Sequence, residues 1–484
     1  MLPRPLDALG SLWREAGQDA AALAHVELPG AEPVLPSSFA VGTAAQVSIA
    51  AAALAAAELW RLRTGEQQRV RVPMRDAAIE FRSERYLRVD GQPTPEPWDK
   101  IAGTYRCADG RWVRLHTNFP HHRDGVLALL RCEYDRAAVE HALQGWRAEA
   151  FETAAAEAGL VVTAMRSFAD WDAHPQGRAV NRLPVLSIEK IADAPSESLP
   201  AATRPLDGIR VLDLTRVIAG PVCGRCLATH GAEVMLITAA HLPFMLPVVI
   251  DSGRGKLSAL LDLRHEPERA RLRQLIRGAD IFVQGYRPGA LGRLGFGPEE
   301  VAALRPGIVY VSLSAYGHEG PWADRRGFDS LVQNVSGLNA AEAEAAGSDQ
   351  PKPLPAQALD HASGYLMAFG AMTALARRAR EGGSWHVRVS LAQTGRWIRE
   401  LGRVTGGFSC SDPGFDDVRD RLEESISGFG RLTAVRHAAE LSLTPARWSL
   451  PSVPLGTDQP IWPRDQADGD TRAPATSRGG QRPP

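Results

Sequence analysis

The stretch that decides the fold is 208–238, GIRVLDLTRVIAGPVCGRCLATHGAEVMLIT. The apolar run GIRVLDLT predicts a buried strand, VCGRCLATHG predicts a helix that Gly231 ends, and AEVMLIT predicts the next strand. Further strands are predicted in LSALLDL, ADIFVQG and GIVYVSL, and further helices in RARLRQLIRG and from His361 to Arg380. Apolar strands that alternate with helices are typical of a parallel sheet covered on both faces. We therefore predict an α/β fold whose main domain, residues 208–402, is a doubly wound parallel sheet.

The segments on either side of this domain differ in texture. Residues 1–35 predict a lead-in, 36–100 a helix–strand module, and 101–195 a smaller α/β domain with a hairpin turn at Asp109-Gly110. Residues 196–207 are rich in Pro, Ala and Ser and predict a linker. After the main domain we expect a C-terminal helical region over 403–463 and a disordered tail over 464–484.

One segment is repeated within the chain. Aligned without gaps, residues 36–77 match 353–394 in kind, and each copy reads as a helix, a glycine stop and a strand. In this register Thr43 faces Asp360, so only one copy has a carboxylate at the start of its helix.

Composition excludes several classes of protein. The 55 basic and 56 acidic residues give a net charge of −1, which argues against bulk binding to nucleic acid or to an anionic membrane. Five cysteines in 484 residues are too few for a disulfide scaffold. The N-terminus does not resemble a signal peptide, and the most apolar helical run, 49–60, is too short to span a bilayer. We therefore expect a cytoplasmic protein.

Short motifs leave two minor alternatives open. Cys223-x-x-Cys226 follows a strand, as a redox dithiol would, although two small apolar residues on a helix face explain the same pattern. His121-His122 could bind a metal, but no cysteine or carboxylate stands at ligand spacing, so we expect no metal site. A more specific segment is ADIFVQGYRPGALGRLGF, where the turn after a strand and the next helix N-terminus favour an anion.

Several spaced segments together resemble a known family. In order, VLDLTRVIAGP, GAEVMLI, KLSALLDLR, ADIFVQGYRPGALGRLGF, RPGIVYVSLSAYGHEGPW and HVRVSLAQT are similar to the class III CoA-transferases, of the formyl-CoA and carnitine CoA-transferase type. The similarity is dense over about 205–395 and weaker over 36–190. It implies a CoA-binding doubly wound domain and an aspartate nucleophile, which carries a mixed anhydride and an enzyme–CoA thioester in turn.

The resemblance assigns roles to individual residues. Asp360 matches the nucleophile, and a carboxylate can attack a thioester, although Asp at a helix start is also a common N-cap. Its place near a helix N-terminus predicts an ionised carboxylate. The residues that match CoA-binding positions are Val217, Ile218, Ala219, Lys256, Gly285, Tyr286 and Arg293.

The chain also departs from the family pattern. The family has a basic residue just after its second strand, where this chain has Ala239 and Ala240. A glycine-rich loop is not evident in LNAAEAEAAGSDQ, and the small domain precedes the CoA domain, as in a permuted or partly duplicated chain.

The leading hypothesis is a CoA-transferase that moves CoA between an acyl-CoA and a carboxylic acid, without a permanently bound cofactor. A catalytically silent CoA-binding or scaffolding protein and a redox protein are the alternatives. We also expect a homodimer, with the active site near a domain or subunit boundary.

Overall fold

The computed structural model describes residues 2–96 and 98–463. Its centre is a seven-stranded sheet in the order β11-β10-β9-β12-β13-β14-β8. The strands are β8 (Leu186–Ala192), β9 (Arg210–Leu214), β10 (Glu233–Thr238), β11 (Lys256–Leu260), β12 (Ile281–Gln284), β13 (Val309–Ser314) and β14 (Ser384–Ser390). All neighbours pair in parallel except β8, which runs antiparallel to β14. The predicted parallel sheet is confirmed.

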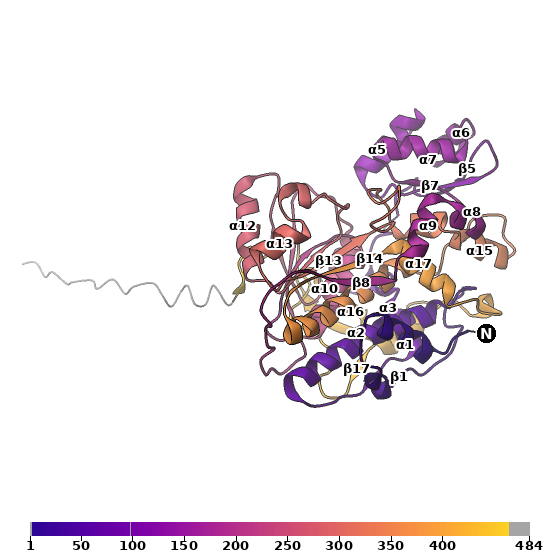
Figure 1. Cartoon of the computed structure of the whole chain (residues 1–484). Coiled ribbons are helices and arrows are strands. Elements are labelled where there is room, and N and C mark those ends of the chain that lie inside the picture. Colours follow the sequence, from indigo (N-terminus) through magenta and orange to yellow (C-terminus); the bar gives the residue numbers. More distant parts are fainter. Residues whose placement is uncertain (1, 97, 464–484) are drawn as a thin grey trace, which may run out of the picture.

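Helices cover both faces of this sheet because successive strand residues point to opposite sides. Val211, Val234 and Val283 face the core that contains α10 and α16, whereas Leu212 and Phe282 face the core that contains α12 and α13. In Figure 1, α12 and α13 lie on one side of the sheet and α16 lies on the other. The helices of this half are α10 (Ala219–Thr229), α11 (Leu246–Ser252), α12 (Glu266–Arg277), α13 (Pro298–Leu304), α14 (Asp329–Val335), α15 (Leu338–Ala345), α16 (Ala358–Glu381), α17 (Leu391–Glu400) and the 3-10 turn η2 (Gly292–Leu294). Residues 193–209, the region of the predicted linker, run as irregular chain into β9.

The repeated segment folds twice into the same elements. The alignment of 36–77 with 353–394 places α2 (Val41–Thr64) on α16 residue for residue, and α3 (Met74–Glu80) on the start of α17. The strand of the first copy is shorter and is β2 (Val70–Arg71), which pairs with β1 (Val26–Glu27) and β17 (Glu440–Leu441) instead of joining the main sheet. The two long helices pack against each other beneath the sheet, with α1 (Pro5–Glu15) beside α2 (Figure 1). By length and composition α2 could span a membrane, but 94% of its most apolar window is buried, as in a core helix.

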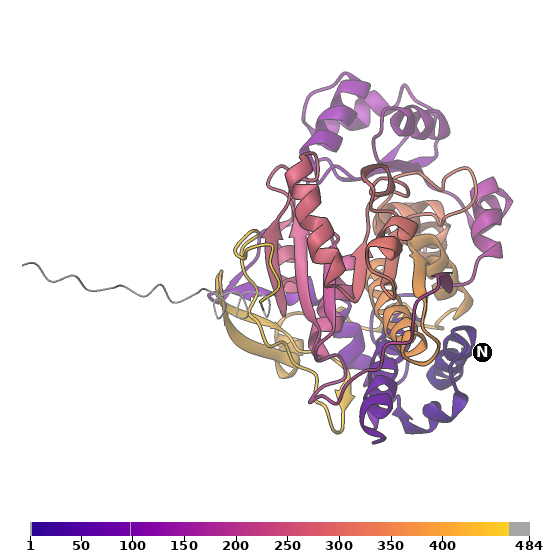
Figure 2. The ribbon, with the colours of Figure 1, turned by 60° about the vertical axis from the view of Figure 1, so that its left-hand side comes forward.

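A small unit stands apart from the sheet, at the top of Figures 1 and 2. Its antiparallel sheet joins β5 (Gly103–Arg106), β6 (Trp112–Leu115) and β7 (Val162–Ala164), and its own core also contains α5 (Pro120–Leu130), α6 (Arg136–Leu143) and α7 (Ala148–Glu157). The predicted hairpin is present, with Gly110 at φ 75° in its turn. The prediction that this domain extends to residue 195 is wrong. The later elements α8 (Phe168–Ala173), α9 (Pro175–Arg182) and β8 pack with the main core, because β8 finds its partner strand almost 200 residues further along the chain.

The prediction of a helical region over 403–463 is also wrong. The segment holds two 3-10 turns, η3 (Gly407–Ser409) and η4 (Asp416–Arg421), and a hairpin of β15 (Leu422–Ser427) and β16 (Gly430–Val435). Gly430, at φ 119°, starts the return strand, and prolines interrupt the rest of the segment. The hairpin continues through β3 (Arg88–Val89) and β4 (Gln92–Pro93) into a four-stranded sheet. The predicted tail, 464–484, lies outside the described residues.

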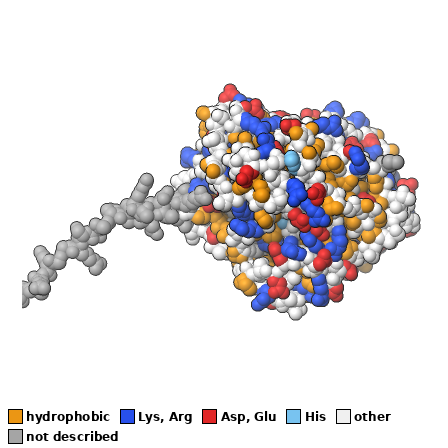
Figure 3. Space-filling model, turned by 90° about the horizontal axis from the view of Figure 1, so that it is seen from below, with side chains coloured by type: hydrophobic (Ala, Val, Ile, Leu, Met, Phe, Trp, Pro, Cys, Tyr) orange, Lys and Arg blue, Asp and Glu red, His pale blue; other side chains and the backbone are white. Residues whose placement is uncertain are grey.

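Two short elements complete the fold, η1 (Ala20–His25) and α4 (Ser83–Tyr86). On the face shown in Figure 3, basic and acidic side chains are interspersed, in keeping with the near-zero net charge.

Candidate active site

The order of the strands creates a crevice beside the middle of the sheet. From β9 the chain goes to β10 on one side, whereas β12 and β13 lie on the other side, so the connections diverge between β9 and β12. Ligands of open α/β sheets bind at such a point, outside the carboxyl ends of the strands. A cavity of about 400 Å³ lies there, and the predicted residues Val217, Ala219, Gly285, Tyr286 and Asp360 line it. We call this the first cavity.

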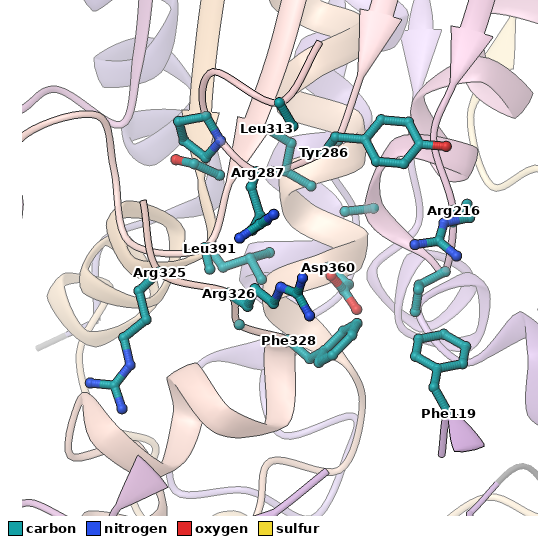
Figure 4. A pocket seen from close by; sticks show the side chains of 18 of the residues that line it. Phe119, Arg216, Tyr286, Arg287, Leu313, Arg325, Arg326, Phe328, Asp360 and Leu391 are labelled. Atoms are coloured by element: carbon teal, nitrogen blue, oxygen red, sulfur yellow. The ribbon is translucent and has the colours of Figure 1, made fainter. Parts of the chain in front are cut away.

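Arginine side chains dominate the charge of the first cavity. Arg216, Arg287, Arg325 and Arg326 line it, and Asp360 is the one acidic residue among its lining residues (Figure 4). Burial, together with the neighbouring Arg287 and Arg216, lowers the pKa of Arg326. The guanidinium of Arg287 makes no hydrogen bond or ion pair with any residue that the structure describes. Arg325 has a long ion pair of 3.9 Å with Glu152, whereas no carboxylate of the described residues pairs with Arg216, Arg287 or Arg326. Clustered cations of this kind are suited to a phosphorylated ligand.

Of these arginines, Arg287 lies in the segment from which the sequence analysis expected an anion contact, but the two cations chosen as site residues were others. Lys256 lies inside the fold, where its Nζ donates to Asp213 Oδ2 at 2.8 Å and to the carbonyl of Pro221 at 2.8 Å. Its side chain is only 2% exposed, so it stabilises the protein interior and does not present a free charge to the first cavity. Arg293 is exposed on η2 and is absent from the residues that line the first cavity.

Asp360 lies at the junction of two cavities. It is the third residue of α16, is only 7% exposed, and lines both the first cavity and a second cavity of about 520 Å³. Burial, followed by the nearby carboxylates of Asp329 and Glu84, raises the pKa of Asp360 well above its usual range. The prediction that the helix N-terminus keeps this carboxylate ionised is therefore wrong in direction, because burial and like charge outweigh the helix dipole.

Asp329, which the sequence analysis missed, supports the start of α16. Its Oδ2 accepts the backbone N–H groups of Leu359, at 2.8 Å, and of Asp360, at 3.0 Å. The N-cap position itself belongs to Gln357, whose side chain makes no capping bond. The alternative in which Asp360 acts as the helix cap is thus not what the structure shows, and the Asp360 side chain is free for another role. Burial raises the pKa of Asp329 to about 6.

The second cavity lies on the other side of Asp360. Residues from both sides of the predicted linker line it, among them Trp98 and His116 from before the linker and Ile218 and Phe328 from the main domain after it. Predicted residue Ile218 therefore belongs to this cavity, and Val217 lines both. Val217 has φ 70°, which is strained for a β-branched residue. Such strained residues are often found at ligand-binding sites.

The first copy of the repeat has no equivalent site. Thr43 is the residue of the first copy that corresponds to Asp360. The N–H of Thr43 donates to Glu32 Oε1 at 2.7 Å, just as the N–H of Asp360 donates to Asp329. Thr43 is 3% exposed, and Val34 and Glu32 pack directly against the backbone of Gly42 beside it. The geometry of the helix start is duplicated, but the carboxylate and the open space are not.

The two minor motifs lie in different surroundings. Cys223 and Cys226 are free thiols on the buried face of α10, and burial raises the pKa of both, which disfavours redox chemistry. His121 and His122 line the first cavity. The described part of the chain contains no group of three or more His, Cys, Asp or Glu that could hold a metal ion.

Comparison with known proteins places these features in one family. The sequence profile of CoA-transferase family III matches residues 15–199 and 206–401. An acetyl-coenzyme A transferase of Hypoxylon pulicicidum is 34% identical over 263 residues, which are 51% of this chain and 43% of that protein. An acetyl-CoA:oxalate CoA-transferase of Acetobacter aceti is 34% identical over 209 residues, 40% of this chain and 53% of the relative.

A solved structure, that of Rv3272 from M. tuberculosis, is 33% identical, and the match covers 41% of this chain and 57% of that one with a TM-score of 0.38. The chain spans about half the length of the curated relatives that it matches. Because the profile covers most of the sequence in two adjacent segments, the chain belongs to CoA-transferase family III.

Proposed function

We propose that this chain is a CoA-transferase in which Asp360 is the nucleophile. The observation that carries the proposal is the place of Asp360, a buried carboxylate between an arginine-lined cavity and a second cavity whose charged residues are mostly acidic. CoA is a polyanion and fits the first cavity, so the thioester carbon would lie where the two cavities meet, beside Asp360. The relatives named above transfer CoA or acetyl-CoA groups, which supports the same class of activity here.

The proposed chemistry needs no group beyond this carboxylate and the two substrates. A carboxylate oxygen of Asp360 attacks the thioester carbonyl, the new C–O bond forms, and the C–S electron pair leaves on sulfur as the CoA thiolate. The thiolate then attacks the aspartyl carbonyl of the anhydride, forms an enzyme thioester, and releases the first acid as its carboxylate. The acceptor acid reverses both steps and leaves as the new acyl-CoA.

The environment of Asp360 suits this role. A carboxylate whose pKa is raised is a stronger nucleophile once it is ionised, and the low exposure of the site protects an anhydride from water. The arginines of the first cavity supply the charge that the missing basic residue at 239–240 would have supplied. These charges suit CoA binding under both hypotheses, and it is the retained carboxylate of Asp360 beside them that favours an active enzyme over the silent CoA-binding alternative.

Mass analysis tests the proposal directly. After incubation with a panel of acyl-CoAs and no acceptor acid, a peptide containing Asp360 is expected to carry CoA as a thioester. Asp360→Asn keeps the size of the side chain, so this variant should fold and bind CoA but form no adduct. An adduct-free wild type that still binds CoA would support the silent alternative, and an Asn variant with normal transfer would overturn the mechanism.

The homodimer stays a prediction, to be checked by light scattering. Because residues of both halves of one chain line the second cavity, we do not expect a subunit contact to complete the site.

A further inference from the structure

The two cavities that meet at Asp360 differ in charge. The first is lined by four arginines, whereas the second is lined by the carboxylates of Glu84, Glu96 and Asp329 and by a single cation, Arg85. Most of its remaining wall is apolar and includes Trp98, Val217, Met245, Pro247, Val248 and Phe328. A second cavity of this kind repels an anion and accommodates an uncharged, mainly apolar group.

Arg85 is the one cation among the residues that line the second cavity, and it has no close partner among the described residues. Its side chain, on α4, is 39% exposed, and its one ion pair with a described residue is a long contact of 4.0 Å from Nε to Glu84 Oε1. Glu84 itself is engaged by His361, whose Nε2 lies 3.1 Å from Glu84 Oε2. Burial lowers the pKa of Arg85, with a further contribution from Arg82, so its charge gains from a new hydrogen-bond partner.

A second carboxylate on the substrate would meet Arg85 and Glu84 together. The guanidinium attracts such a carboxylate, but Glu84, whose Oε1 lies 4.0 Å from Arg85 Nε, repels it, as do Glu96 and Asp329 elsewhere in the wall. A neutral acceptor, such as a hydroxyl or carbonyl oxygen, gains the hydrogen bond from Arg85 without that repulsion.

We propose that the second cavity selects the acyl group, and that its preferred substrate is a monocarboxylic acid with an apolar body and an uncharged hydrogen-bond acceptor that reaches Arg85. This inference rests on the proposed function and names the substrate class of the same site. Dicarboxylic acids are the class that it excludes.

A matched series of acceptor acids tests the inference. For chain lengths of four to ten carbons, the unsubstituted acid, the ω-hydroxy acid and the α,ω-dicarboxylic acid are compared as acceptors with one acyl-CoA donor that forms the Asp360 adduct. At the best length, kcat/KM should be about tenfold higher for the hydroxy acid than for the unsubstituted acid, the effect of one charged hydrogen bond. The dicarboxylic acid should be the poorest acceptor at every length.

Two variants assign the preference to Arg85. Arg85→Met should lower the ratio of kcat/KM for the hydroxy acid to kcat/KM for the unsubstituted acid from about ten to about one. Arg88→Met is the matched control, because Arg88 stacks on Phe415, does not line the second cavity, and should not alter the order of the acids.

The outcomes separate this inference from the proposed function. A dicarboxylic acid that is the best acceptor, or an Arg85→Met variant that affects all acids equally, would overturn the inference while the adduct on Asp360 still forms. Absence of the adduct itself would instead overturn the proposed function, and the inference with it.

Discussion

The pair of buried carboxylates predicts how activity depends on pH. Burial raises the pKa of Asp329 to about 6, and burial with Asp329 raises the pKa of Asp360 further. A raised carboxyl pKa means that the attacking, ionised form is lost as the pH falls through that value, so adduct formation should decline at a higher pH than an ordinary aspartate would give. Asp329→Asn removes a like charge and should shift this acid limb to lower pH.

The rate of adduct formation between pH 5 and 9, measured by rapid quench, checks this prediction. Asp349→Asn, an exposed carboxylate outside both cavities, is the control. An acid limb that stays in place in Asp329→Asn would mean that the two carboxylates do not interact.

Arg287 is the residue at which the structure most changes the prediction for CoA binding. Its guanidinium, which pairs with none of the described residues, lines the first cavity, whereas Arg293, the sequence-based candidate, does not. Arg287→Ala should therefore weaken CoA binding by about 1.5–3 kcal/mol, the range for a hydrogen bond to a charged group. Calorimetric titration at fixed ionic strength measures this change, and Arg293→Ala should bind CoA like the wild type. Equal weakening by both substitutions would return Arg293 to the site.

Lys256 connects three secondary-structure elements. Its Nζ lies on β11 and contacts Asp213 of β9 and the Pro221 carbonyl of α10, next to the turn that carries Val217. Lys256→Met leaves the buried carboxylate of Asp213 without a cationic partner, with only the hydrogen bond from the Thr215 hydroxyl, and should lower the free energy of unfolding by about 3–5 kcal/mol. Urea denaturation measures the loss. Lys190→Met, which removes an exposed ion pair with Asp193, should change stability by less than about 1 kcal/mol.

The sequence predicts an element well when the residues that determine it are neighbours in the chain. In both copies of the repeat, helix-forming residues are followed directly by a glycine that ends the helix. Helices α2 and α16 accordingly have the predicted register. The same holds for the apolar strands of the main sheet. In contrast, the prediction assigned β8 to the small domain, because its partner strand β14 is distant in the chain.

The candidate site shows the same limit. Asp360 and the turns at 217–219 and 285–286 lie in segments with a recognisable pattern, and the structure brings them together. The arginines that surround them could not be identified from the sequence, because all but four of the 55 basic residues are arginine and none of these stands out by its type. Asp329 lies about 30 residues before the helix that it supports, and the signal that could have found it is the acidic start of the short helix α14.

At the scale of the whole molecule, the duplicated helix explains why one chain should be sufficient for catalysis. Helices α2 and α16 come from equivalent segments and pack together within one chain, as equivalent helices do across the two-fold axis of a dimer. Only the copy with Asp360 keeps an open site, and elements from both halves of the chain line its cavities. We therefore expect one CoA adduct per chain and no exchange of site residues between chains.

Complementation tests this expectation. Asp360→Asn lacks the nucleophile, and a variant with Arg216, Arg287 and Arg326 all changed to Ala lacks the proposed CoA-binding charges, so each should be inactive at low CoA concentration. If a site were shared between chains, co-expression of the two variants would rebuild intact sites in mixed dimers. Because each site lies within one chain, the co-expressed pair should have no more activity than the sum of the separate variants. Recovery of a quarter or more of wild-type activity would show that the partner chain supplies part of the site.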